Sequence, residues 1–409
     1  MIAAPGWQPM YARRADHMKA SEIRELLKLL ERPGIISFAG GIPDPELFPA
    51  AAAAQAYRDA LATQASVSVA LQYSVSEGYG PLRHWIADHM ATHGVQASAD
   101  NILITSGSQQ ALDFLGKLLL TPGDTVLVTT PSYLGALQAF SAYEPRYDTI
   151  CPEQSNRTPA SYADGAGKET PGALVKFAYV VPDFANPTGE TLSQVARNRL
   201  LDLVSELDVP VVEDSAYSAL RFEGNDVPSL QALDVGRCGS IDRARVIYLG
   251  TFSKTVAPGL RIGWICASPA IIGRLVLIKQ ASDLNVSVIN QMVMHKLIEK
   301  GRHADLIVQA RAHYRPKRDA MLQSLSNEVP SGVTWTKPEG GLFVWVTLPE
   351  AVSGYWLLSR AIEEAKVAFV PGRAFFHDGS GANTMRLSYS LPKPAMIEAG
   401  ISRIATLLR

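Results

Sequence analysis

The chain has 409 residues, of which 47% are hydrophobic and 19% are charged, and its formal net charge is −1. A chain of this length is too long for one ordinary hydrophobic core and long enough for two domains. Because the net charge is close to zero, we expect neither nucleic acid nor an anionic membrane surface as a partner.

The cysteines and the hydrophobic runs bear on the cellular compartment. Cys151, Cys238 and Cys266 lie far apart and form no CxxC pair, so their spacing predicts neither a disulfide framework nor a zinc site. Residues 1–20 contain no continuous apolar stretch typical of a signal peptide, and no later run has the length and purity of a membrane span. We therefore expect a cytoplasmic protein that binds no metal and does not enter a membrane.

The N-terminal part of the chain predicts two helices separated by a loop. In residues 21–30, SEIRELLKLL, isoleucine and leucine recur at helical spacing after Ser21, which is placed as an N-cap. Arg24 lies off this apolar stripe, where an arginine is by default solvated. Residues 38–49, FAGGIPDPELFP, form a loop that either lines a pocket or only connects domains. The alanine-rich residues 50–62 predict the second helix.

The middle of the chain alternates between strands and helices. Runs rich in β-branched and aromatic residues predict buried strands over residues 101–105, 124–130, 175–182, 209–214, 245–250 and 261–266. Helical segments such as ALDFLGKLLL and LSQVARNRLLDLVSEL follow some of these strands. This order predicts an α/β fold, with a mainly parallel sheet flanked by helices on both faces.

The C-terminal part predicts a second, smaller domain. Its pattern is helical from about residue 282 to 323, then alternates like an antiparallel or mixed sheet, and ends in a helix over residues 394–408. We expect a large domain over residues 49–295 and a small domain over residues 296–409, which residues 1–48 join.

Polar side chains follow several strands of the predicted sheet. Ser108, Asn186, Asp214 and Lys254 all lie just beyond a strand, and ligands of such sheets bind beyond the carboxyl ends of the strands. Three of these residues also have an ordinary explanation. Lys254 can be a surface loop lysine, Asp214 can be the N-cap of the next helix, and Ser108 can belong to a common strand-to-helix turn.

One ligand, pyridoxal phosphate, would account for all of these residues together. Its aldehyde suits Lys254, whose amine can attack a carbonyl when burial or a nearby cation lowers its pKa. Its protonated ring nitrogen suits Asp214, and its flat ring suits Tyr133. Its remaining polar groups suit two sets of side chains: Asn186 and Tyr217 for the phenolic oxygen, and Ser108, Gln109, Ser253 and Arg261 for the phosphate.

A series of sequence blocks also resembles a known family. The blocks are SFAGGIPDPELFP, LQYSVSEGYGPLR, ITSGSQQALD, PSYLGALQAF, FANPTGE, VVEDSAY, GTFSKTVAPGLRIGW, KPEGGLFVW and MRLSYS. In content and order they resemble class I aminotransferases of fold type I, in the branch that includes 2-aminoadipate, kynurenine and aromatic amino acid aminotransferases. The resemblance covers nearly the whole chain. It implies a mainly parallel sheet of the seven-stranded type beside a smaller α+β domain built from both termini.

The resemblance implies pyridoxal 5′-phosphate as the cofactor and gives the site residues their roles. Lys254 would hold the cofactor as a Schiff base and move the proton at the substrate α-carbon, Asp214 would keep the ring nitrogen protonated, and Tyr133 would stack on the ring. Asn186 and Tyr217 would bind the ring oxygen. The residues around the phosphate would be Ser108, Gln109, Thr251, Ser253 and Arg261, with threonine at position 251 where many relatives have serine.

The resemblance also implies how a substrate is held. Arg386 lies within the alternating strand TMRLSYS, where an unpaired arginine is costly, so it either pairs internally or binds a carboxylate. By resemblance that carboxylate is the α-carboxylate of the substrate, with Asn186 and Gly41 beside it. Ser21 and Arg24 would receive a distal carboxylate, while apolar neighbours on the same helix would admit larger side chains.

The expected reaction is transfer of an amino group from an L-amino acid to a 2-oxo acid such as 2-oxoglutarate, by a ping-pong route. The donor would be 2-aminoadipate, glutamate, or an aromatic or large aliphatic amino acid.

The resemblance also implies a homodimer with shared active sites. Tyr73 matches a tyrosine of the family that reaches the phosphate of the neighbouring subunit.

Three other functions compete with this expectation. A pyridoxal-phosphate lyase would use the same lysine and aspartate and differ only in its substrate pocket. A regulator that keeps the fold as a ligand sensor would carry a winged-helix domain ahead of it, whereas about 20 residues precede the recognisable blocks. A dinucleotide-binding oxidoreductase would need a GxGxxG turn, and none follows the first strands.

Overall fold

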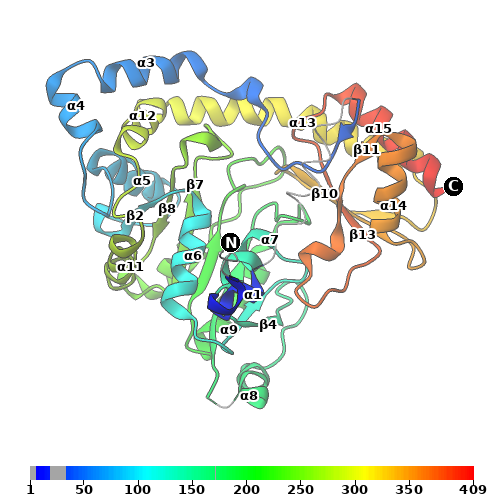
Figure 1. The fold of residues 1–409 in the computed structure, drawn as a ribbon, viewed down its shortest axis with the longest axis horizontal. Coiled ribbons are helices and arrows are strands. Elements are labelled where there is room, and N and C mark those ends of the chain that lie inside the picture. Colours follow the sequence, from blue (N-terminus) through cyan, green and yellow to red (C-terminus); the bar gives the residue numbers. More distant parts are fainter. Residues whose placement is uncertain (1–5, 19–33, 171) are drawn as a thin grey trace, which may run out of the picture.

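A computed structural model describes residues 6–18, 34–170 and 172–409 of the chain (Figure 1). Its centre is a seven-stranded sheet with the strand order β2-β8-β7-β6-β5-β3-β4. The strands are β2 (Ile102–Thr105), β8 (Gly263–Cys266), β7 (Val246–Thr251), β6 (Val211–Asp214), β5 (Val175–Val180), β3 (Thr125–Val128) and β4 (Arg146–Thr149). Strand β8 runs opposite to the other six strands, which are parallel to one another. The expected mainly parallel sheet is therefore confirmed.

Helices cover both faces of this sheet, which is why most residues of its inner strands are apolar. One face packs against α6 (Ser108–Leu119), α7 (Leu134–Ser141) and α11 (Pro269–Ser282). The other face packs against α5 (Gly80–Thr92), α8 (Pro159–Glu169), α9 (Gln194–Glu206), α10 (Leu230–Cys238) and α12 (Val288–Ile298). Alternate strand residues therefore point into different cores, for example Leu103 and Ile104 of β2.

A second, smaller core lies beside the large sheet (Figure 1). It contains an antiparallel sheet ordered β12-β13-β10-β9, and a parallel pair of β1 and β11. These strands are β1 (Ile36–Ser37), β9 (Thr334–Trp335), β10 (Phe343–Thr347), β11 (Val367–Ala368), β12 (Val370–Pro371) and β13 (Thr384–Ser388), and the helices beside them are α14 (Gly354–Arg360) and α15 (Pro394–Leu408). Because β1 pairs with β11, segments near both ends of the chain build this part, as expected.

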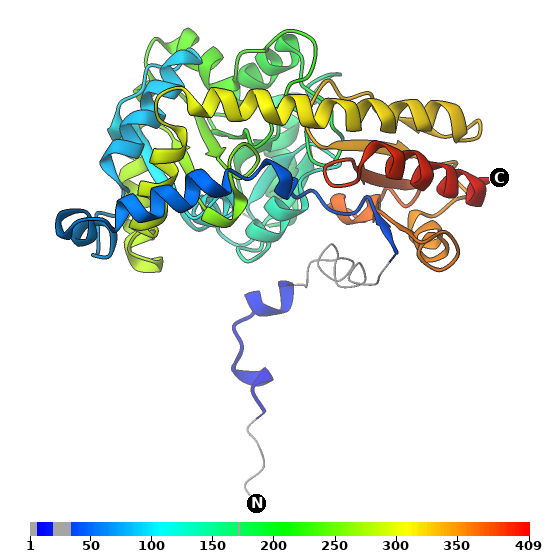
Figure 2. The same ribbon diagram turned by 90° about the horizontal axis from the view of Figure 1, so that it is seen from above.

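The long helix α13 (Arg302–Glu328) links the two cores (Figure 2). Ala310 and Tyr314 belong to the core of the large sheet, whereas Met321 and Leu325 belong to the smaller core. Pro316 lies inside the helix between these two pairs. The domain boundaries at residues 48/49 and 295/296 stay a prediction.

Several short elements complete the described part of the chain. They are the helices α1 (Arg14–His17), α3 (Ala50–Ala60) and α4 (Gln64–Ala70), the 3-10 helices η1 (Gln8–Met10), η2 (Pro45–Leu47), η3 (Ala99–Asn101), η4 (Ile241–Arg243), η5 (Pro258–Leu260) and η7 (Gly372–Phe375), and a π-helical turn, η6 (Ala361–Ala365). The helix expected over residues 21–30 lies outside the described residues. In the described part of the chain, no helix has the length and apolar character to cross a membrane.

Candidate active site

A cavity of about 220 Å³ opens at the carboxyl ends of the parallel strands. It is lined by Ser108, Gln109, Tyr133, Val181, Asn186, Asp214, Ala216, Tyr217, Thr251, Ser253, Lys254, Pro258 and Arg261. All the cofactor-binding residues predicted from the sequence are in this set except Tyr73. The topology brings them together because β2, β5, β6 and β7 all end at the same edge of the sheet.

One end of the cavity has the geometry of a phosphate site. Helix α6 begins at Ser108 after Gly107, whose φ is 74° and which makes no side-chain cap. A side chain at position 107 would meet the guanidinium, since an added Cβ would lie 2.3 Å from Arg261 Nη2. Uncapped N–H groups at a helix N-terminus beside a guanidinium bind phosphate well.

Neighbouring side chains hold this end of the cavity in place. Arg261 Nη2 donates to the Ser106 carbonyl at 3.2 Å, and the Thr251 and Ser253 hydroxyls are 2.9 Å apart. The Gln109 side chain donates to the Gly135 carbonyl at 2.7 Å. Gln109 therefore uses its side chain to tie α6 to the start of α7.

Asp214 at the end of β6 has an unused acceptor. The residue is 3% exposed, and its Oδ2 accepts a hydrogen bond from the Tyr179 hydroxyl at 2.9 Å. Its buried Oδ1 has no hydrogen-bond partner among the described residues. Burial raises the pKa of Asp214 to about 6, against the hydrogen bonds from Tyr179 and the Ala216 backbone. A buried carboxylate oxygen without a partner is costly, and a protonated ring nitrogen would satisfy it.

The alternative role of Asp214 as a helix N-cap is wrong. After β6, the next helix is α10, which begins at Leu230. Its cap is Ser229, whose Oγ accepts from the Ala232 backbone N–H at 3.0 Å. The carboxylate therefore contributes no capping and faces the cavity instead.

Lys254 lies on the connection between β7 and β8, partly buried and within the cavity lining. Its Nζ donates to the Gly41 carbonyl at 3.0 Å. Burial lowers the pKa of Lys254 to about 8, helped by the charges of Arg386 and Arg261 and opposed by Asp214. The interpretation as an exposed surface lysine is therefore wrong. A neutral amine, which can attack a carbonyl or accept a proton, forms far closer to neutral pH here than on an ordinary lysine.

Polar and aromatic groups surround the space between Asp214 and Lys254. Asn186 hydrogen-bonds the Tyr217 hydroxyl, and the Tyr217 ring lies 5.6 Å from Lys254 Nζ. Tyr133 precedes the first residue of α7, and burial raises its pKa to about 12, so its hydroxyl stays protonated. Together these groups provide a face for stacking and donors for a phenolate oxygen.

Arg386 in β13 combines deep burial with an incomplete set of partners. It is 2% exposed and lies over the rings of Phe343 and Phe375, at 4.4 and 5.1 Å. Its Nη1 donates to Asn186 Oδ1 at 2.7 Å and its Nη2 to the Ala39 carbonyl at 2.8 Å, while its Nε has no partner among the described residues. Burial lowers its pKa to about 10, so it stays charged. Its internal partners are neutral, so a carboxylate is still needed to balance the charge.

Some expected site residues are not part of this cavity. Tyr73 is 80% exposed and lies outside the cavity lining. Ser21 and Arg24 lie outside the described residues.

Two residues of the site were not predicted from the sequence. They are Tyr179, which is hydrogen-bonded to Asp214, and Ala39, which is hydrogen-bonded to Arg386. A tyrosine within the apolar strand VKFAYVVP was the available signal, because a buried hydroxyl usually has a partner.

The chemistry of the donor set fits pyridoxal phosphate, and comparisons with known proteins agree. Residues 33–404 match the profile of the family aminotransferase class I and II. The 2-aminoadipate transaminase of Thermus thermophilus is 44% identical, over 98% of this chain and 97% of that protein. Aromatic-amino-acid aminotransferase 1 of Thermococcus litoralis is 41% identical, over 98% of this chain and 95% of that protein.

A solved structure gives the same result. LysN, the alpha-aminoadipate aminotransferase of Thermus thermophilus complexed with N-(5′-phosphopyridoxyl)-L-leucine, has a TM-score of 0.87 and 42% identity, over 99% of this chain and 98% of that chain. The fold and the site thus define a pyridoxal-phosphate-dependent enzyme. The chain belongs to the aminotransferase class I and II family. Amino-group transfer is its reaction, and the lyase alternative is not favoured.

Proposed function

We propose that the chain moves the amino group of acidic, aromatic and large aliphatic L-amino acids to a 2-oxo acid such as 2-oxoglutarate. One observation carries this proposal. A lysine of lowered pKa and a buried carboxylate, one oxygen of which has no partner among the described residues, line a single cavity together with an uncapped helix N-terminus and Arg261. The relatives named for aminoadipate and aromatic substrates support the acidic and aromatic donor classes, and the leucine adduct bound by LysN supports the large aliphatic class.

We assign the protein's groups the following work. The bound cofactor supplies an electron-poor ring that withdraws charge from the substrate α-carbon. The Lys254 amine takes and returns the proton at that carbon, and Asp214 holds the ring nitrogen in its protonated form. Arg386 and Asn186 orient the substrate α-carboxylate. Tyr133 covers a face of the ring and excludes water.

A screen of amine donors with 2-oxoglutarate tests this function. We expect glutamate to form with 2-aminoadipate, with aromatic amino acids and with leucine as donors. Ammonia or carbon dioxide released from an amino acid without a 2-oxo acid would favour the lyase. If no donor yields glutamate while the protein holds its cofactor, the proposed donor classes are wrong.

Arg24 is the residue we propose for reading the side-chain carboxylate of acidic donors. A charge-assisted hydrogen bond contributes about 1.5–3 kcal/mol, so Arg24→Ala should lower kcat/KM for glutamate and 2-aminoadipate by about 10- to 100-fold. Phenylalanine and leucine serve as the internal control and should be nearly unaffected. Equal losses for both donor classes would mean that Arg24 supports the fold and does not recognise the substrate.

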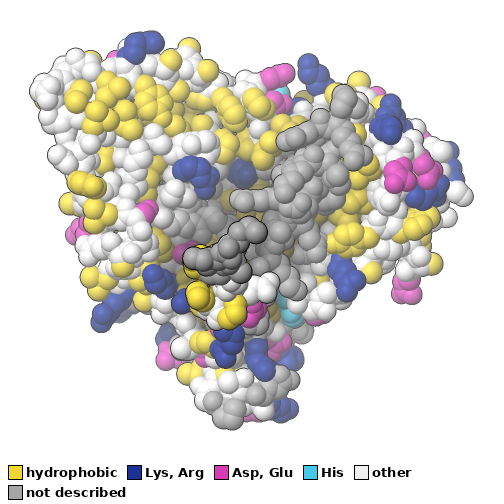
Figure 3. All heavy atoms as spheres, in the orientation of Figure 1, with side chains coloured by type: hydrophobic (Ala, Val, Ile, Leu, Met, Phe, Trp, Pro, Cys, Tyr) yellow, Lys and Arg dark blue, Asp and Glu magenta, His cyan; other side chains and the backbone are white. Residues whose placement is uncertain are grey.

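We also propose that the enzyme is a homodimer that shares its active sites. Large apolar side chains are exposed on and after α3 and α4, namely Leu61, Val69, Leu71, Tyr73 and Val75. Hydrophobic side chains also gather over α3, α4 and α12 in the surface view (Figure 3). Such a patch is typical of a subunit interface.

A cytoplasmic location, expected from the cysteine pattern, stays a prediction.

The dimer makes Tyr73 a testable residue. If Tyr73 donates to the phosphate bound by the partner subunit, Tyr73→Phe should weaken cofactor affinity by about 10- to 100-fold, the value of one hydrogen bond to a charged group. Tyr355→Phe, in α14 outside the cavity, serves as the matched control. Equilibrium dialysis gives the affinity and sedimentation gives the mass. A fully active monomer would contradict the shared site.

A further inference from the structure

The backbone between β1 and η2 contacts two of the active-site cations, Lys254 and Arg386. The Gly41 carbonyl accepts from Lys254 Nζ at 3.0 Å, and the Ala39 carbonyl accepts from Arg386 Nη2 at 2.8 Å. The loop also approaches the Phe343 ring so closely that an added Cβ at Gly41 would lie 2.6 Å from its Cζ. Any displacement of this loop therefore disturbs the reacting amine and the carboxylate-binding guanidinium together.

The loop has few attachments of its own. At its start, Phe38 is hydrogen-bonded to Ala368 and Ser388 through its backbone. No described residue accepts a hydrogen bond from the backbone N–H of Gly40, Gly41 or Ile42. The next firm attachment is therefore at the far end of the loop.

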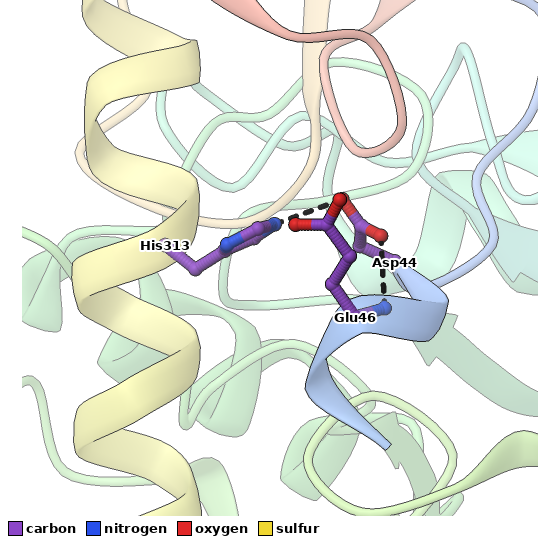
Figure 4. A group of neighbouring side chains, drawn as sticks. All are labelled: Asp44, Glu46 and His313. Atoms are coloured by element: carbon purple, nitrogen blue, oxygen red, sulfur yellow. Dashed lines mark hydrogen bonds and ion pairs between the residues drawn. The ribbon is translucent and has the colours of Figure 1, made fainter.

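That attachment is the buried side chain of Asp44 (Figure 4). Its Oδ2 accepts from Lys317 Nζ at 2.5 Å and from His313 Nε2 at 2.8 Å, both from α13. Its backbone N–H donates to the Tyr314 hydroxyl at 2.9 Å, and its Oδ1 accepts from the Glu46 N–H at 3.1 Å. Burial opposes ionisation, but the bonds from Lys317 and His313 keep the pKa of Asp44 below its usual value.

Lys317 connects this attachment to the strand that carries Arg386. Its buried Nζ also donates to the carbonyls of Ser390 and Leu391, at 3.0 and 3.3 Å, just after β13. The Lys317 ammonium thus holds both the loop between β1 and η2 and the end of β13 against α13.

The same ammonium argues against a metal site at Asp44. Asp44, Glu46 and His313 have ligand atoms within 4.8 Å of one another, but a cation there would be repelled by Lys317.

We propose that Asp44 is a positioning residue for the reaction: pinned by Lys317 and His313, it holds the backbone of residues 39–41 against Lys254 and Arg386. The proposal rests on the roles assigned above to those two cations. It accounts for a buried ionic cluster away from the cavity lining. Within the described part of the chain, the loop is hydrogen-bonded to the amine and to the carboxylate-binding guanidinium but not to the phosphate-binding residues. Loosening it should therefore affect substrate turnover more than cofactor affinity.

The test compares Asp44→Asn with Glu46→Gln in the holoenzyme. Asparagine keeps the size of Asp44 and removes its charge, whereas Glu46 is an exposed carboxylate two residues away. A misplacement of about 1 Å can cost about 100-fold in rate, so we expect Asp44→Asn to lower kcat/KM for acidic and aromatic donors equally, by about 10- to 100-fold. Cofactor affinity should stay within about threefold of the wild type. Glu46→Gln should behave as wild type.

Hydrogen exchange of the apoprotein supplies a readout that does not depend on activity. A peptide covering residues 38–48 should exchange faster in Asp44→Asn, while peptides of α6 keep the wild-type rate. If Asp44→Asn does not fold, His313→Gln takes its place. This variant removes only one partner of the Asp44 carboxylate, so kcat/KM and the exchange rate of residues 38–48 should change in the same directions but by less.

Three outcomes would overturn the proposal. Wild-type kinetics in a folded Asp44→Asn protein would show that the loop keeps its position without the Asp44 charge. An equal loss of cofactor affinity and turnover would show that Asp44 stabilises the whole fold and does not position the loop specifically. A loss in Glu46→Gln that added divalent metal reverses would indicate a cation site. Each of these leaves the wild-type donor screen positive, whereas failure of the proposed function would appear in the wild-type enzyme itself.

Discussion

Replacing Asp214 by alanine should lower kcat by about three orders of magnitude or more, since each tenfold loss corresponds to about 1.4 kcal/mol. Asp214 Oδ1 is buried in the cavity and has no partner among the described residues. A protonated ring nitrogen placed there would gain a charged hydrogen bond, which keeps the ring an effective electron sink. Steady-state rates at saturating cofactor, with glutamate as donor, measure the change.

Tyr179→Phe is the matched control for this variant. Tyr179 donates to the other oxygen of Asp214 at 2.9 Å, so its removal leaves the carboxylate in place and takes away one neutral partner. We expect a loss of no more than about tenfold, in line with about 1 kcal/mol for one hydrogen bond. If Asp214→Ala keeps both its cofactor and nearly full activity, Asp214 has only a structural role.

Lys254→Arg should remove nearly all amino-group transfer, by a factor of about 10⁴ or more, because a positioned general base contributes about 10²–10⁴ and the amine is also the nucleophile. Arginine keeps the positive charge but does not lose its proton in proteins. The variant therefore preserves the electrostatics near Gly41 while removing the neutral amine. Lys337→Arg, an exposed lysine on the connection before β10, is the control and should retain full activity. Substantial activity in Lys254→Arg would place the base elsewhere.

The fold was largely predictable where burial follows from composition. The valine- and isoleucine-rich strands β2, β3 and β5 to β8 were predicted within a few residues, and the closing helix over residues 394–408 is confirmed. Strand β4, with the sequence RYDT, was missed because it is an edge strand whose residues are all half-buried. Helix α8 was missed because its sequence PASYADGAGKE is rich in residues that also favour turns.

The candidate site was predictable where a residue follows a strand. Asp214, Asn186 and Lys254 lie at strand ends, and a parallel sheet brings such ends together. Bonds between remote segments gave no signal in the sequence. Asp44 and Lys317 are 273 positions apart, and the Gly41 carbonyl contacts Lys254 through its backbone, which no side-chain pattern can encode.

The most direct test of the central claim is to locate the cofactor on the chain. After borohydride reduction of the purified yellow protein, digestion and mass spectrometry should find the pyridoxyl group on the peptide that contains Lys254, because this lysine combines a lowered pKa with a place in the cavity beside the phosphate site. The other lysines should stay unlabelled, including the buried Lys279, whose amine is engaged by Asp283. A pyridoxyl group on any lysine other than Lys254 would contradict the account.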